Sequence, residues 1–351
     1  MNLPAYIFEL PTILEINLVM TLIFFTLALL LISLILYLRV HKNIQNRRKE
    51  KLDILLIDFI NNYLFNEDFN KSTEIEVFKT KHLKTPLDNQ IATHQILVFA
   101  ENLKGESSAV IKEIFHGFGL YQILISDLKK KAWYKQAKAL YVSYQLDLEI
   151  PIPLVDSLIN AKNNDLRQQA FLYFLHRSTD KPLEFLDKVK TPLTLWQQIH
   201  IENGLKSFEG ETPDFSRWLY HEITTVVMFC MKMVAEYNQY QHIPILLQFL
   251  NHENHEIRQQ AIISLRKMEV PKMMSILIEN FPEESIQIKQ EILITIGEIG
   301  TEEHLKSVAP FIQQEESILK VEYLKMVRYF NPNTFKKHKG DFENIIHDKY
   351  V

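Results

Sequence analysis

The sequence predicts an all-α protein in which one N-terminal transmembrane helix is followed by an α-solenoid of stacked helix pairs. Three observations predict this fold: an uncharged apolar run near the N-terminus, apolar residues at helical spacing through most of the remainder, and recurrence of that spacing about every 30 residues. Of the 351 residues, 47% are hydrophobic and only 8 are glycine. The chain is therefore apolar enough to fold and poor in the residue that makes tight turns.

The apolar run is LVMTLIFFTLALLLISLILYL, residues 18–38, and it contains no charged residue. At about 1.5 Å per residue a helix over this run is about 31 Å long, which matches a bilayer core of about 30 Å. A cleaved signal peptide would need a basic N-terminal region, a shorter apolar core and a small-residue cleavage site, and the first 38 residues lack all three. We therefore predict a transmembrane helix over residues 17–39 that anchors the chain in the lipid bilayer, preceded by a short extracytoplasmic segment, residues 1–16.

The basic residues that flank the apolar run all lie on its C-terminal side. They are Arg39, Lys42, Arg47, Arg48, Lys49 and Lys51. Because positive charge stays in the cytoplasm, this asymmetry predicts an external N-terminus and a cytoplasmic C-terminal domain. The six side chains are also candidate contacts to anionic headgroups, although a stop-transfer charge cluster alone accounts for them.

The segment after the anchor predicts a connector. Residues 51–65 have apolar side chains at helical spacing, and residues 66–88 are polar and mixed, which favours a loop or a weak helix. We assign residues 40–88 to a basic juxtamembrane segment, connector helix and loop. Residues 89–351 are assigned to the repeat domain with a C-terminal end segment.

The repeat is clearest in two stretches 91 residues apart that share RQQA. IPLVDSLINAKNNDLRQQA (152–170) aligns with IPILLQFLNHENHEIRQQA (243–261) without a gap. From Ile257, apolar residues at offsets of 0, 4, 5, 8 and 11 form one helix face, and the same template recurs along the chain. The predicted anchors of the successive second helices are Leu166, Leu195, Ile223, Ile257, Ile288 and Leu319.

The position after the anchor is repeatedly basic. Its basic members, the predicted structural repeat ladder, are Arg167, Arg258, Lys289 and Lys320. They either line a groove for an anionic partner or pair within the repeats. Replacing Arg258 by alanine separates the two hypotheses, because lost stability with intact partner binding indicates the structural role.

A helix pair of this length, with Pro153 or Pro244 in the first turn of its first helix and a basic residue in its second, resembles the HEAT-repeat (armadillo-like helical) family over roughly residues 89–330. The resemblance implies that each ladder residue pairs with an acid or a carbonyl of a neighbouring repeat. Residues 103–140, with L-x-G-E and LKKKAW, are similar to the segment before the repeats in membrane-anchored HEAT-repeat proteins of Bacteroidota-type bacteria. Such proteins are often encoded beside a membrane glycosyltransferase.

The resemblance therefore implies a single-pass protein of the bacterial inner membrane. It implies a non-catalytic scaffold that binds protein partners, a glycosyltransferase among them, in polysaccharide synthesis or export. The alternative is a HEAT-like enzyme or enzyme subunit of the DNA-glycosylase or lyase type. The net charge of −4 argues against nucleic acid as a partner.

The sequence shows no signature of a catalytic, cofactor or metal site. It contains no G-x-S-x-G, no phosphate loop and no dinucleotide fingerprint. His252 and His255 lie in a polar inter-helix segment without further ligands nearby. The one cysteine, Cys230, lies in an apolar run and is predicted to be a core thiol. We expect no enzyme activity and no cofactor.

Overall fold

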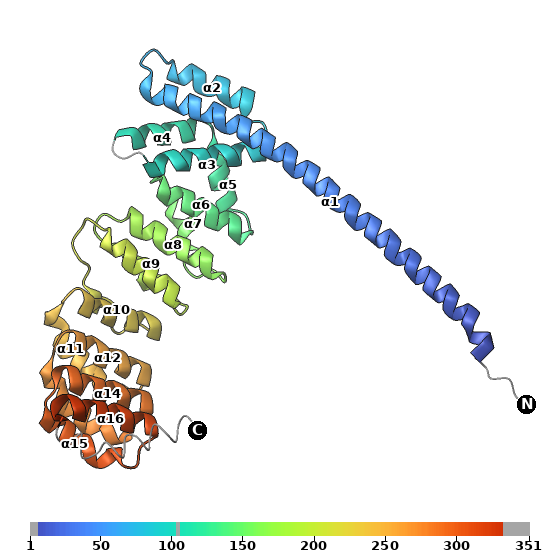
Figure 1. Ribbon diagram of the computed structural model, residues 1–351. Coiled ribbons are helices and arrows are strands. Elements are labelled where there is room, and N and C mark those ends of the chain that lie inside the picture. Colours follow the sequence, from blue (N-terminus) through green and yellow to red (C-terminus); the bar gives the residue numbers. More distant parts are fainter. Residues whose placement is uncertain (1–5, 103–105, 333–351) are drawn as a thin grey trace, which may run out of the picture. The chain divides into compact units, whose positions relative to one another are not determined.

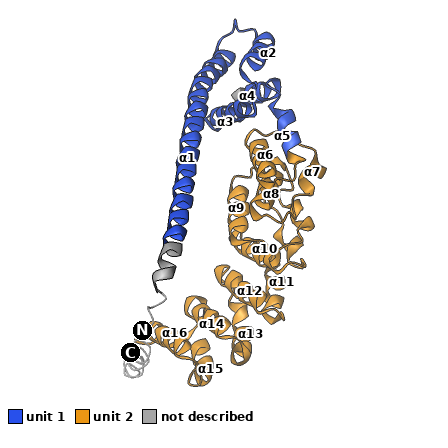
Figure 2. Cartoon of the chain, turned by 90° about the vertical axis from the view of Figure 1, so that its right-hand side faces the viewer, with its two compact units in different colours: residues 1–127 blue, residues 128–351 orange. Residues whose placement is uncertain are grey.

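The computed structural model describes residues 6–102 and 106–332, and within these ranges every regular element is a helix (Figure 1). Sixteen α-helices and six short 3-10 helices are present there. The chain forms two compact units, residues 1–127 and residues 128–351 (Figure 2). The predicted all-α class is confirmed for the described residues. The predicted end segment is residues 331–351, and all of it after residue 332 lies outside them.

The first unit is built around α1, a single helix from Tyr6 to Phe65. The predicted transmembrane helix and the predicted connector are therefore parts of one unbroken helix. All the described side chains from residue 14 to residue 51 are exposed. By length and composition, this apolar helix is a candidate membrane span.

The C-terminal part of α1 belongs to a small helical bundle. It packs on α3 (Pro86–Asn102), while α2 (Lys71–His82) packs on α4 (Glu106–Gly117). The buried side chains of α1 recur at helical spacing and are Leu52, Leu56, Phe59, Ile60 and Tyr63.

Aromatic rings form the centre of this bundle. The ring centroid of Phe59 lies 4.7 Å from that of Phe78 in α2 and 5.3 Å from that of Phe118, which follows α4. The loop or weak helix expected over residues 66–88 contains a formed helix, α2, whose N-cap Asn70 accepts a hydrogen bond from the backbone of Thr73. Residues 89–127, which the sequence predicts to begin the repeat domain, fall in the same compact unit as α1.

The second unit consists of helices that pack in series. α6 packs on α8 and α8 on α9; further along, α10 packs on α12, α12 on α14 and α14 on α16. The elements, after α5 (Leu120–Leu128) at the boundary, are α6 (Trp133–Gln145), α7 (Ile152–Asp156), α8 (Asn164–Arg177), α9 (Leu195–Lys206), α10 (Thr224–Glu236), α11 (Ile243–Gln248), α12 (His255–Lys267), α13 (Met274–Asn280), α14 (Ile286–Ile299), α15 (Glu302–Ile312) and α16 (Ser317–Phe330).

The helix starts define a more regular register than the apolar pattern predicts. The N-cap residues of the second helices are spaced by 31, 29, 31, 31 and 31 residues, and they are Asn163, Thr194, Ile223, Asn254, Ser285 and Glu316. The residue three positions after each cap is buried, and these residues are Leu166, Gln197, Val226, Ile257, Ile288 and Leu319. The anchors predicted at Leu195 and Ile223 are therefore wrong by two and three residues.

A buried polar side chain explains the first of these errors. Leu195 is 72% exposed in the first turn of α9, whereas Gln197 is 1% exposed. Gln197 completes a capping box with Thr194 and donates to the backbone oxygen of Asn164 at 3.1 Å. Because its polar atoms are bonded, the glutamine occupies a core position that an apolar template assigns elsewhere.

The ends of three helices follow the same spacing. The residues after the C-caps of α6, α10 and α12 have positive φ: Asp147 (47°), Asn238 (53°) and Glu269 (53°). In each case the next backbone N–H bonds back to the last helical turn, as from Val270 to the oxygen of Leu265 at 3.1 Å. Asp147 and Asn238 are 91 residues apart, the interval that separates the two RQQA segments.

Candidate functional site

The basic residues of α1 divide between two sides of the helix. At about 100° per residue, Arg47, Arg48 and Lys51 share one side, and the others, Arg39, Lys42 and Lys49, lie away from it. Only the first three line a groove. The predicted set of six membrane-surface contacts is thus not one structural cluster.

The groove has a volume of about 500 Å³ and lies where α2 ends beside α1. Figure 1 shows α2 alongside the C-terminal part of α1, and a short turn joins the two helices. The groove is lined by Ile44, Arg47, Arg48, Lys51, Leu52, Leu55, Lys81, His82, Lys84 and Asp88. The other three basic residues of the groove, Lys81, His82 and Lys84, were not predicted from the sequence. The basic run KTKHLK, residues 79–84, was the signal for them. Because a loop was expected there, the sequence did not indicate where these side chains lie.

An ion pair between exposed Arg48 and a buried carboxylate fixes the base of the groove. Arg48 donates two hydrogen bonds of 2.7 Å to the carboxylate of Asp88, which is fully buried. The same carboxylate accepts from the backbone of Lys84 at 3.1 Å and from the backbone and hydroxyl of Thr85, both at 2.8 Å. Burial alone would raise the pKa of Asp88, but the hydrogen bonds from Arg48 and Thr85 outweigh it and hold that pKa below its usual value.

The remaining cations of the groove are not neutralised. Arg47, Lys51, Lys81 and Lys84 have no ion-pair or side-chain hydrogen-bond partner within the described part of the chain. Between them lies His82, whose pKa is lowered by burial and by the charges of Lys81 and Lys84. The groove therefore carries net positive charge, although the whole chain is slightly acidic.

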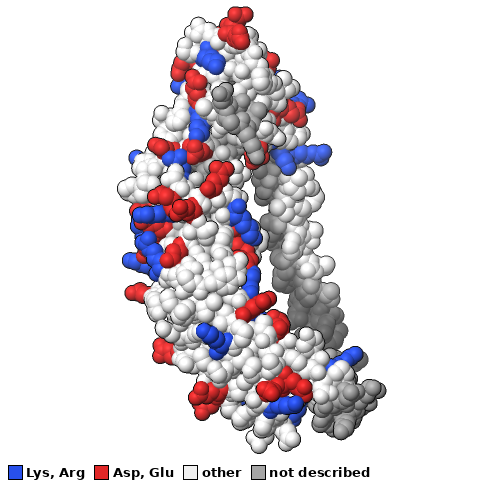
Figure 3. Space-filling model, turned by 90° about the vertical axis from the view of Figure 1, so that its left-hand side faces the viewer, with Lys and Arg blue, Asp and Glu red and all other residues white. Residues whose placement is uncertain are grey.

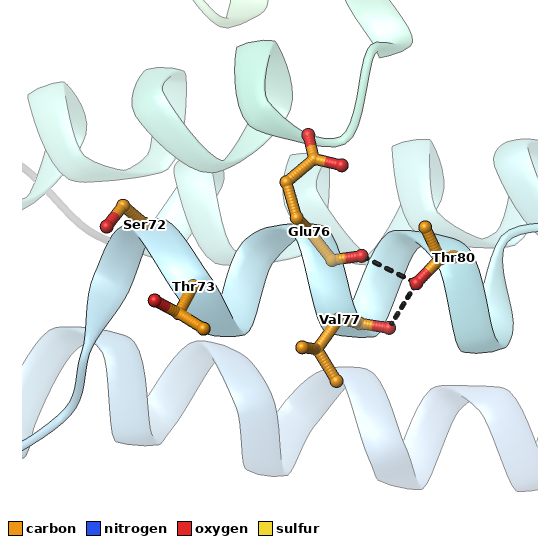
Figure 4. A pocket seen from close by; sticks show the side chains of 5 residues that line it. All are labelled: Ser72, Thr73, Glu76, Val77 and Thr80. Atoms are coloured by element: carbon orange, nitrogen blue, oxygen red, sulfur yellow. Dashed lines mark hydrogen bonds between the residues drawn. The ribbon is translucent and has the colours of Figure 1, made fainter.

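A second depression, on the surface of α2, offers less chemistry. It is lined by Ser72, Thr73, Glu76, Val77 and Thr80 (Figure 4). The hydroxyl of Thr80 donates to the backbone oxygens of Glu76 at 2.8 Å and Val77 at 3.1 Å. All five residues come from one helix, so no groups from different elements converge there.

The ladder residue Arg258 in the second unit binds both its own repeat and the next. It donates to the backbone oxygen of His252, before α12, at 2.7 Å. It also makes two 2.7 Å hydrogen bonds to the carboxylate of Glu284, which directly precedes the N-cap of α14. The side chain of Glu284 is nearly buried.

Two other ladder residues have related contacts. Lys289 lies 2.6 Å from the carboxylate of Glu315, which precedes the N-cap of α16, and 5.7 Å from the ring centroid of Phe281. Arg167 donates to the backbone oxygen of Ala161 at 2.7 Å and to the side chain of Asn164. Burial lowers the pKa of Arg167.

The ladder is not continuous. Lys320 has no side-chain partner among the residues that the structure describes. In the corrected register Gln198 and Val227 occupy the ladder positions of α9 and α10. Gln198 donates to the backbone oxygen of Leu193 at 3.4 Å, much as Arg167 and Arg258 bind carbonyls before their own helices. Four ladder positions therefore bond to groups in the turns between helices, and the structure does not gather the ladder into one site. The four are Arg167, Gln198, Arg258 and Lys289.

The described residues contain no cluster of three or more His, Cys, Asp or Glu side chains that could hold a metal ion. Cys230 is buried in α10, and burial raises the pKa of its thiol. Figure 3 shows acidic and basic side chains interspersed over one face of the packed helices, whereas the exposed length of the long helix is almost free of them.

Comparison with known proteins adds little to this geometry. No protein-family model matches the chain, and no curated protein does. Among solved structures, the crystal structure of an engineered protein is similar at 12% identity, over 80% of this chain and 98% of that one, with a TM-score of 0.21.

Proposed function

We propose that this protein is a membrane-tethered scaffold or adaptor, with a HEAT-like α-solenoid that binds protein partners at the cytoplasmic face of the inner membrane. The observation that carries the proposal is α1, because one unbroken helix is exposed and apolar at one end and forms the core of a folded unit at the other. A helix of this kind holds a folded domain at a bilayer surface.

The second unit supports a binding role. Its helices pack in series with a step of about 31 residues, which is the arrangement that gives repeat proteins an extended binding surface. Large aromatic side chains remain exposed on this unit: Trp196 is 61% exposed, and Tyr220 and Tyr329 are about equally open to solvent. Tryptophan and tyrosine are the residues most enriched in the energetic centres of protein interfaces.

Affinity purification of the full chain from membranes in a mild detergent tests the proposal. We expect a specific membrane or membrane-associated protein to co-purify, and we expect Trp196→Ala to reduce its recovery. A purification that recovers no partner beyond those of an unrelated single-span protein contradicts the scaffold function. A glycosyltransferase among the partners would support a role in polysaccharide synthesis or export.

A further inference from the structure

The basic groove of the first unit has the features of a binding site for a phosphate-bearing anion. Positively charged groups from two elements meet there: Arg47 and Lys51 from α1, and Lys81 and Lys84 from the end of α2 and the turn after it. None of the four has an acidic partner within the described residues. Like charges held together in this way repel one another, and a bound anion removes that repulsion.

The groove is held in shape by contacts that do not use these four side chains. The ion pair between Arg48 and the buried Asp88 links α1 to the start of α3, and Asp88 also fixes the turn that carries Lys84. Ile44, Leu52 and Leu55 provide an apolar wall.

The position of the groove along α1 points to the membrane surface. Ile44 lies six residues beyond Leu38, the end of the apolar run, which is about 9 Å along a helix, and Lys51 lies about 20 Å beyond it. The polar headgroup layer extends about 5–8 Å from the hydrocarbon core. Ile44, at one end of the groove, therefore lies just outside the headgroup layer, and the ligands Arg47 and Lys51 follow on its aqueous side, about 14 and 20 Å beyond the apolar run.

We propose that this groove binds the phosphate of an anionic phospholipid headgroup, with Arg47, Lys51, Lys81 and Lys84 as its cationic ligands and His82 beside them. The lipid as source rests on α1 crossing the bilayer, as proposed above. The shared chemistry is a phosphate group, so a soluble phosphate is the competing source.

Native mass spectrometry of the full chain in a non-ionic detergent tests the site by titration with phosphatidylglycerol and with phosphatidylcholine. We expect selective binding of phosphatidylglycerol, and about a tenfold or greater loss of affinity in K81A/K84A. The matched control is K42A/K49A, which removes the same charge from the other side of α1. It should change the affinity less than twofold. Equal losses in the two variants would mean diffuse attraction only and would overturn the site, as would no loss in K81A/K84A.

Two further arms identify the source and exclude a folding defect. Inorganic phosphate that displaces the phospholipid at millimolar concentration would overturn the headgroup assignment in favour of a soluble phosphate. In histidine-labelled protein, with the His82 signal identified by H82Q, lipid binding should raise the pKa of His82, and an unchanged pKa would contradict the proposed position of the anion. Selective lipid binding by a chain that alkaline extraction removes from membranes would refute the tether alone. Retention without selective binding would refute the groove alone.

Discussion

Arg258 connects two consecutive helix pairs through groups that are mostly hidden from water. Its guanidinium bonds a carbonyl before its own helix and a nearly buried carboxylate before the next one. Because the carboxylate of Glu284 depends on this partner, removing the arginine leaves a buried charge unpaired. A structural role for the ladder therefore predicts a large effect on stability.

We expect Arg258→Ala to reduce the free energy of unfolding of the second unit by about 1–3 kcal/mol. Urea denaturation followed by tryptophan fluorescence measures it, since all three tryptophans lie in that unit. Lys306→Ala is the control, because it removes only an exposed pair with Glu302 and should leave the stability nearly unchanged. Unchanged stability combined with lost partner binding would favour the anionic groove instead.

The buried carboxylate of Asp88 makes the first unit sensitive to acid. Its pKa is lower in the folded chain than in the unfolded chain, so its contribution is complete above the unfolded pKa of about 3.9 and is lost as the pH falls through the folded pKa. We expect Asp88→Asn to weaken amide-exchange protection in α1 and α3 at pH 7, and the difference from wild type to shrink below about pH 4.

Asp58→Asn is the control for this experiment, because Asp58 is an exposed carboxylate on the same helix. It should leave protection unchanged at both pH values. A difference between wild type and Asp88→Asn that stays constant with pH would show that the charge of Asp88 does not matter.

At the scale of elements, the sequence predicts that a helix exists better than it predicts which of its residues face the core. The second helices from α12 onward begin where the apolar template places them, because their anchors are isoleucine or leucine. In α9 the core position is taken by Gln197, and α10 is buried nearly all round, so an apolar pattern there has no preferred face. The spacing of apolar residues within one helix cannot predict either buried face, because both faces depend on neighbouring helices.

The basic groove, too, could be predicted only in part, because it depends on how helices pack. The basic residues of α1 were visible in the sequence, but their division into two sides and their meeting with Lys81 and Lys84 depend on α2 folding back along α1. The turn between the two helices contains no glycine or proline to announce a hairpin. That arrangement depends on tertiary packing, as of Phe59 against Phe78 and Phe69.

We expect Phe59→Ala to destabilise the bundle of the first unit by about 3–5 kcal/mol, because the ring is buried among four other aromatic rings. Hydrogen exchange of α2 and α4 in the full chain measures the loss. Phe65→Ala, at the end of the same helix, removes a ring that is 73% exposed and should change protection by less than about 0.5 kcal/mol. Similar effects of the two substitutions would contradict the described core.

At the scale of the whole molecule, the membrane prediction can be tested by fractionation and proteolysis. We expect alkaline carbonate to leave the chain in the membrane pellet, because about 31 Å of uncharged helix partitions into lipid. Protease added to intact spheroplasts should leave the C-terminal domain whole, and protease added after lysis should digest it. Digestion in intact spheroplasts would reverse the proposed orientation.

The length of α1 has a mechanical consequence. Between residue 12 and residue 65 the helix contains neither glycine nor proline, so it has no built-in hinge. The 27 residues after Leu38 form an arm of about 40 Å beyond the apolar run. Where bilayer thickness changes the tilt of such a helix by about 10°, the far end of the arm sweeps about 7 Å parallel to the membrane. With α1 in the proposed membrane position, the bundle at the end of the arm would therefore shift when the thickness of the surrounding bilayer changes.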